Sequence, residues 1–107
     1  MDHLGSIILA PAPEQVALDR WVKLIASHPH LVPIPPRDGT NPFSGGPFLY
    51  PAHPGGVHVK TEGTTIGMMI WAHDGTNRIA VEGNVGLVEQ IAAEVASKLG
   101  GVYRRGQ

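Results

Sequence analysis

Histidine is the residue type in this chain best suited to chemistry, because imidazole binds metals and transfers protons near neutral pH. Six histidines are present among 107 residues. His28 and His30 flank a proline at a spacing that allows an extended chain to chelate a metal, and His53 and His58 could add ligands. Imidazole sites need a third and a fourth ligand on rigid elements, whereas these histidines are expected at a helix end and in a loop. We therefore expect no metal and no cofactor. A small metal-dependent or hydrolytic enzyme built around these four histidines is the alternative hypothesis.

Nucleophilic catalysis has one candidate, Ser44, with a histidine as its base and an aspartate to orient that base. The candidates for these two roles are His30, His53 or His73 and Asp38 or Asp74. The surrounding sequence is not a nucleophile elbow, and nothing helical is expected after it to direct amide groups towards an oxyanion. The glycines that follow Ser44 are better explained as a turn before Pro47. The sequence therefore predicts no catalytic residues, and we expect binding rather than catalysis.

The segment 35–45 places donors, acceptors and an aromatic ring within eleven residues. A purely structural explanation is open, because Asp38 precedes a turn glycine and Phe43 would anchor the segment to the core. The other explanation is a recognition loop, since loops held by a rigid scaffold often carry function. The residues predicted to bind a partner are Arg37, Asp38, Asn41, Phe43 and Trp71.

In this segment the chain resembles a group of small uncharacterised bacterial proteins that share a Pro-Pro-Arg-x-Gly-x-Asn-Pro-Phe-x-Gly stretch. Their further shared features are a His-Pro-x-Leu helix end, a valine-rich strand, a tryptophan-containing strand before an Asp-Gly turn, and a late helix ending in Leu-Gly. The matching residues here are 28–31, 35–45, 57–59, 70–75 and 87–100. The resemblance implies a common fold and no function.

Composition excludes several classes of partner. Lys and Arg number 8 and Asp and Glu 9, so the formal charge is −1. The chain cannot build the large basic patch that nucleic-acid binding requires. It has no cysteine, which removes disulfides and thiolate zinc sites. No stretch approaches the roughly 20 apolar residues of a membrane span, and the first residues do not resemble a signal peptide. We expect a cytoplasmic protein without nucleic-acid or membrane partners.

Hydrophobic periodicity predicts two helices and five strands. Apolar residues recur at helical spacing in two segments, the second capped by Asn84, and alternate in two of the strands. The expected helices are 14–27 and 84–99, and the expected strands are 6–10, 57–61, 66–72, 78–82 and 101–105. Tight turns should join the three central strands into an antiparallel meander.

Residues 29–56 contain eight of the ten prolines. They also contain too many apolar residues for a solvated linker, among them Leu31, Ile34 and Phe48. We expect an ordered arm that lies over the domain.

These elements predict a single α+β domain over residues 1–107. Two helices should pack on one face of a mostly antiparallel sheet in the order β-α-arm-β-β-β-α-β, a ferredoxin-like variant. We expect Met69 and Trp71 on the outer face, opposite the helices. The expected function is that of a non-enzymatic protein-binding or accessory module, of inhibitor or immunity type, which uses the arm and the Trp71 face. A homodimeric structural subunit that completes its sheet is the second alternative.

Overall fold

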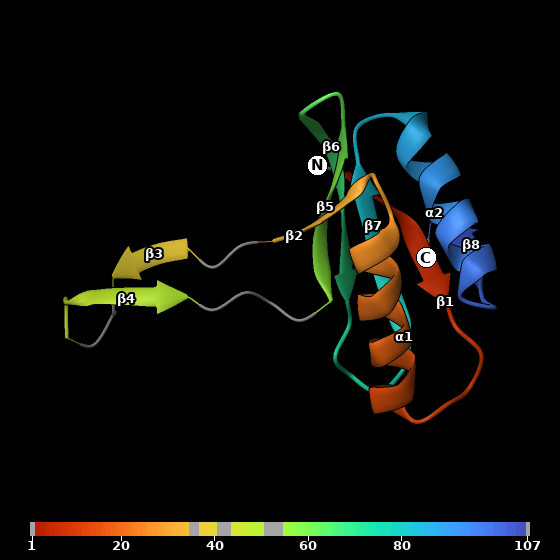
Figure 1. Cartoon of the computed structure of the whole chain (residues 1–107), viewed down its shortest axis with the longest axis horizontal. Helices are drawn as coiled ribbons and strands as arrows, with labels where there is room; N and C mark the ends of the chain where they lie inside the picture. Colours follow the sequence, from red (N-terminus) through yellow and green to blue (C-terminus); the bar gives the residue numbers. More distant parts are fainter. Residues whose placement is uncertain (1, 35–36, 41–43, 51–54, 107) are drawn as a thin grey trace.

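The computed structural model describes residues 2–34, 37–40, 44–50 and 55–106, with the backbone alone for 37–40 and 47–50. Its elements follow the chain in the order shown in Figure 1. They are β1 (Asp2–Ile8), α1 (Glu14–Ser27), β2 (Leu31–Pro33), β3 (Arg37–Thr40), β4 (Pro47–Tyr50), β5 (Gly56–Thr61), β6 (Thr64–Trp71), β7 (Arg78–Gly83), α2 (Gly86–Lys98) and β8 (Val102–Arg105).

Six of the strands form one antiparallel sheet in the order β2-β5-β6-β7-β1-β8. The predicted meander is confirmed, because β5 pairs with β6 and β6 with β7. Each helix is a crossover between two strands that run in the same direction. α2 links β7 to β8 across β1, as in a ferredoxin-like sheet. α1 links β1 to β2 across three strands, because β5 and β6 are inserted beside β7.

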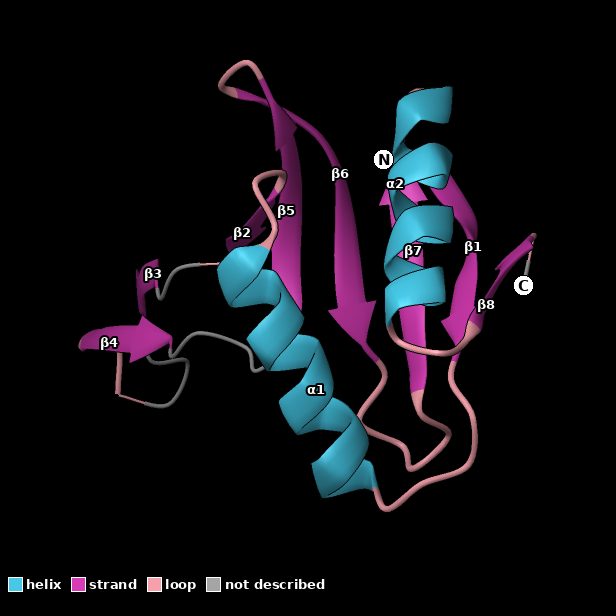
Figure 2. Cartoon of the chain, turned by 45° about the vertical axis from the view of Figure 1, so that its right-hand side comes forward, coloured by secondary structure: helices cyan, strands magenta, loops and turns pink. Residues whose placement is uncertain are grey.

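Both helices cover the same face of the sheet (Figure 2), which confirms the predicted α+β class. α1 begins after Pro13, whose fixed φ suits a helix start, and ends before Pro29. α2 begins later than expected: its N-cap is Val85 and no side chain caps it, so the prediction for Asn84 is wrong. The helix residues buried against the sheet are Ala17, Trp21, Ile25, Val88, Ile91, Ala92, Val95 and Ala96.

The predicted face of Trp71 and Met69 is wrong. Trp71 is 1% exposed and Met69 is fully buried. They pair with Ile79 and Val81 of β7, which are also buried beneath the helices. The indole N–H of Trp71 donates to a carboxylate oxygen of Glu14 in α1 over 3.1 Å. Trp71 is therefore part of the core and not of a docking surface.

Two glycines explain why this face of β6 and β7 receives the helices. A Cβ on Gly67 would lie 2.5 Å from a carbonyl oxygen of β7 and 2.9 Å from Val88 of α2. A Cβ on Gly83 would lie 2.8 Å from the same valine. The absence of side chains lets α2 approach the sheet closely here. Because side chains alternate along a strand, Met69 and Trp71 share this face with Gly67.

The segment 29–56 differs from its prediction. Leu31 of β2 joins the core and pairs with Val59 of β5, while β3 and β4 form a separate antiparallel hairpin. Figures 1 and 2 show this hairpin beside the β2 edge of the sheet, pointing away from both helices. The prediction that the arm lies over the domain is therefore wrong for β3 and β4. The predicted arm was the whole segment 29–56; below, the name arm is used only for this hairpin with its connecting loop, residues 37–50.

No helix in the described part of the chain is long and apolar enough to cross a membrane.

Candidate functional site

The face of the sheet opposite the helices is the first candidate site. We call it the outer face. Strand pairing defines two rows of residues that cross it. The first row is Val32, His58, Met68, Glu82 and His3, and the second is Gly56, Ile70, Ala80, Ser6 and Arg104. Neither helix contributes to this side, because both cover the other face of the sheet (Figure 2).

Apolar side chains dominate the centre of the outer face. Met68, Ile70, Ala80 and Ile8 are half-buried by their neighbours in the sheet. Val32 and Val102 at the two edge strands are 37% and 52% exposed. Exposed single hydrophobic residues are common on proteins, but a contiguous apolar sheet face is typical of an interaction surface.

The charged side chains on the strands of the outer face are mostly basic. Alternation places Arg78 and Arg104 on this side, and Lys60 follows from its spacing to His58 within β5, next to the β5–β6 register shift. Among the described strand residues, Glu82 is the carboxylate on this side. The neighbouring residue Arg105 supports this assignment, because it pairs with Glu89 of α2 on the helix face at 3.5 Å. The outer face thus combines an apolar centre with a basic rim.

The β6–β7 turn adds one carboxylate near this rim. Hydrogen bonds from the side chain and the backbone N–H of Thr76 lower the pKa of Asp74, and the charge of Arg78 contributes less. Asp74 is fully exposed, so it is an ordinary turn residue that caps its own backbone.

The arm holds two of the predicted partner-binding residues in known backbone positions. Arg37 pairs with Tyr50 and Asp38 pairs with Leu49 across the hairpin. Asn41 and Phe43 lie outside the described residues. The structure therefore separates the predicted set, since Trp71 is in the core and the β3 residues are in the arm.

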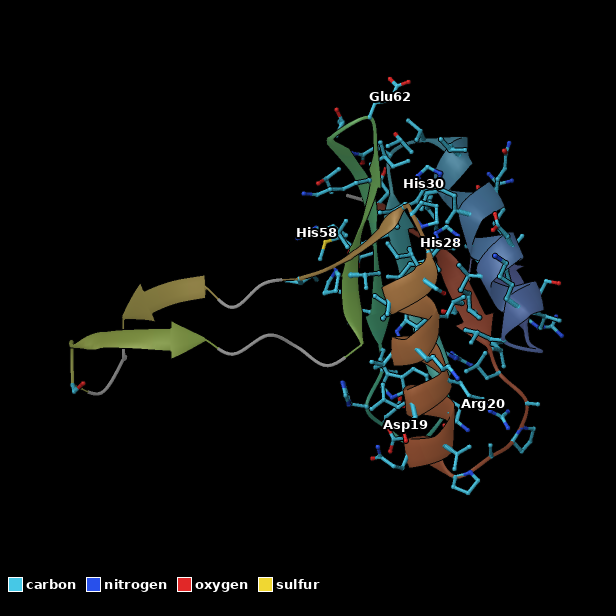
Figure 3. All side chains as sticks on the ribbon, viewed as in Figure 1. Asp19, Arg20, His28, His30, His58 and Glu62 are labelled. Carbon is cyan, nitrogen blue, oxygen red and sulfur yellow. The ribbon has the colours of Figure 1, made fainter. Side chains whose placement is uncertain are left out.

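The described histidines of the predicted set do not form one site, although the ring centroids of His28 and His30 lie 5.8 Å apart. His28 has a buried side chain whose Nδ1 accepts the backbone N–H of His30 and whose Nε2 lies 3.3 Å from Glu94. His30 Nδ1 contacts the carbonyl oxygen of Lys60. His58 projects from the outer face, away from both (Figure 3), and His53 lies outside the described residues. Among the described residues, no three His, Cys, Asp or Glu side chains are placed to hold a metal ion.

Two further side-chain pairs fasten α2 to its surroundings. The charge and hydrogen bond of Lys98 lower the pKa of Glu94, with a smaller contribution from His28. Burial, with the hydrogen bond to Glu89, raises the pKa of Tyr103 to about 12. Both arrangements have a structural explanation, because they hold α2 against α1 and β8.

The Ser44 hydroxyl accepts the backbone N–H of Gly46 over 3.3 Å, in the connection between β3 and β4. This connection is at the end of the arm remote from the sheet (Figure 1), whereas His30 and His73 belong to the main body. The hydrogen bond to Gly46 gives the serine a role in the turn.

Sequence reasoning missed the outer-face residues. Both faces of β6 are apolar, with Met68 and Ile70 on one side and Met69 and Trp71 on the other. An apolar pattern on both sides is itself a signal that the strand has no solvated face.

No protein-family model matches the chain, and no curated protein or solved structure is significantly similar to it. The resemblance in residues 35–45 stays a prediction.

Proposed function

We propose that this protein is a non-enzymatic binding module that docks a protein partner on its outer face, with the arm as a second contact. The observation that carries the proposal is the apolar sheet face with a basic rim, opposite both helices. An accessory role of inhibitor or immunity type is the form of function we infer, because binding alone fulfils it. The proposal keeps the cytoplasmic location expected from the sequence.

The chemistry of the outer face favours a particular partner. An apolar centre formed by Met68 and Ile70 suits a partner with its own apolar patch. The basic rim suits carboxylates around that patch, since complementary charge sets orientation and association rate. We therefore propose a different protein with an acidic rim as the partner.

A second copy of this chain fits less well. Face-to-face packing would bring Lys60, Arg78 and Arg104 of both copies to one interface, against Glu82 and the rim residue Asp74 of each. Like charges across an interface are unfavourable. Sedimentation of the isolated protein should therefore show a monomer, and a dimer broken by Val102→Asp would identify the homodimer instead.

The arm supports the proposal independently. An isolated two-stranded hairpin is only marginally stable in water, and three or more strands or a packed layer are normally needed. β3 and β4 pair with each other and with none of the six strands of the main sheet. A partner that contacts the arm would supply the missing layer, and Arg is among the residue types enriched at binding hot spots. Arg37 is therefore the arm residue to test.

The experiment compares two aspartate variants. Val102→Asp introduces a charge on the outer face at a position 52% exposed, and Leu87→Asp does so on α2 at 41% exposed. Proteins captured by the wild type should be captured by Leu87→Asp and lost by Val102→Asp. With the purified partner, Ile70→Asp should weaken binding by about thirtyfold, which corresponds to about 2 kcal/mol.

Melting curves are recorded for each variant, so that a loss of binding is read only from folded protein. Backbone amide shifts on titration with the partner should fall on β5, β6, β7 and β1. Equal binding of Val102→Asp and wild type, or shifts confined to the helices, would overturn the docking surface. Arg37→Ala tests the arm separately, and full affinity in that variant would remove the arm from the proposal.

A further inference from the structure

The two helices enclose a groove on the side of the molecule opposite the proposed docking surface. Its volume is about 550 Å³, within the range of roughly 300 to 1,000 Å³ typical of small-molecule sites. Its lining includes Arg20, Lys23, Leu24, Ser27, Lys98 and Leu99. Arg20 extends from α1 on the side that faces α2, whereas Asp19 lies on the other side of that helix (Figure 3).

The groove is positively charged. Three of the chain's eight basic residues, Arg20, Lys23 and Lys98, line it, and no carboxylate does. The nearest described acid is Glu94, which lies 3.3 Å from Lys98 and also contacts His28. Asp19 accepts a hydrogen bond from Gln15 one turn earlier. The C-terminal ends of α1 and α2 both border the groove and each contributes about half a negative charge. Arg20 and Lys23 therefore leave the groove with an excess of roughly one positive charge.

A small recess with a mixed polar and apolar lining adjoins the groove. It has a volume of about 60 Å³, which is room for roughly two groups the size of a water molecule. Leu9, Pro11 and Ala17 line it, and it shares Arg20 and Leu99 with the groove. A ligand whose charged group contacts Arg20 would therefore have a small, partly apolar pocket beside it.

We propose that the groove between α1 and α2 binds a small organic anion, with a phosphate or carboxylate group at Arg20 and Lys23 and a short apolar part in the recess. Guanidinium groups bind both oxyanions through paired hydrogen bonds, and lysine adds a point charge. The floor formed by Leu24 and Leu99 excludes water from one side of the charged group. The site is independent of the protein-docking function, because it lies on the other face of the sheet.

The experiment uses three probes on the full chain: inorganic phosphate, butyrate and butyl phosphate. Backbone amide shifts are followed by NMR at low ionic strength, where exposed charges are least screened. We expect saturable shifts at Arg20, Lys23, Ser27 and Gly100. Butyl phosphate should bind more tightly than inorganic phosphate if the recess takes the apolar part. Comparison of butyl phosphate with butyrate identifies the preferred oxyanion.

Arg20→Ala should weaken the best probe by about tenfold. The matched control is Arg78→Ala, which removes an exposed arginine from the outer face and should leave the affinity unchanged. Melting curves confirm that both variants are folded. Three results would overturn the proposal: no saturable shift with any probe, equal effects of the two alanine variants, or shifts spread over all exposed basic residues. Equal affinity for butyl phosphate and inorganic phosphate would remove the recess from the site.

Discussion

Replacing Trp71 by alanine tests the assignment of the two sheet faces most directly. The side chain is 1% exposed, lies under α1 and donates its indole N–H to Glu14. Truncating a buried large aromatic residue costs about 3 to 5 kcal/mol. The total stability of a domain is about 5 to 15 kcal/mol, so the variant should lose a large fraction of it.

Met68→Ala is the matched comparison, because the Met68 side chain projects from the opposite face of the same strand and is only half-buried. We expect a loss of about 1 kcal/mol there, since part of the apolar surface stays in contact with water. Urea unfolding followed by circular dichroism gives both free energies. At roughly 4 °C or more per kcal/mol, the melting temperature of Trp71→Ala should fall by at least about 12 °C.

Trp71→Phe separates packing from hydrogen bonding. It keeps an aromatic ring in the core but removes the donor to Glu14, which should cost about 1 kcal/mol for the hydrogen bond in addition to the smaller ring. A cost below about 1 kcal/mol for Trp71→Ala, or an equal cost for Met68→Ala, would refute the face assignment and with it the outer face as a docking surface.

Four other predictions concern stability. Gly67→Ala should destabilise by about 2 kcal/mol or more, because its Cβ would come within 2.5 Å of a neighbouring carbonyl oxygen, whereas Gly86→Ala in the first turn of α2 meets nothing within 4 Å and should stabilise by up to about 1 kcal/mol; urea unfolding measures both. The folded state holds the Tyr103 proton more tightly than the unfolded state, so the stability from this group is complete below pH 10.0 and is lost as the pH rises to about 12. Tyr103→Phe should abolish this alkaline step in melting curves, and an unchanged step would contradict it. The pKa of Glu94 is lowered on folding from 4.5, so its contribution is present above pH 4.5 and is lost as the pH falls through the folded value; Glu94→Gln should flatten that acid limb. Zinc should leave the melting temperature unchanged, because no three described His, Cys, Asp or Glu side chains are placed to hold it. A specific ion at about 100 times its dissociation constant would add roughly 2.7 kcal/mol to the free energy of unfolding. A rise of that size, abolished in His28→Ala, would restore the metal-site hypothesis.

The sequence by itself determined the type and order of the main elements. The helical spacing of Trp21 and Ile25 and of Ile91 and Val95 predicted both helices, although α2 begins later than expected. These signals are local, because a 3.6-residue period and a flanking proline act within one element. The meander was equally readable, since Gly63 and the residues around Asp74 mark its turns.

The tertiary structure alone decided which side of each strand faces the helices. β6 is apolar on both sides, so its alternation fits either orientation, and a shift of one residue exchanges the two faces. The choice depends on contacts distant in sequence: Gly67 and Gly83 admit Val88, and Trp71 reaches Glu14. For the same reason the sequence did not predict the basic groove, because Arg20 and Lys98 are 78 positions apart and their helices meet only after the sheet has formed. Alternation within a strand is a property of the backbone, whereas the assignment of its two faces is set by the layer that packs on it.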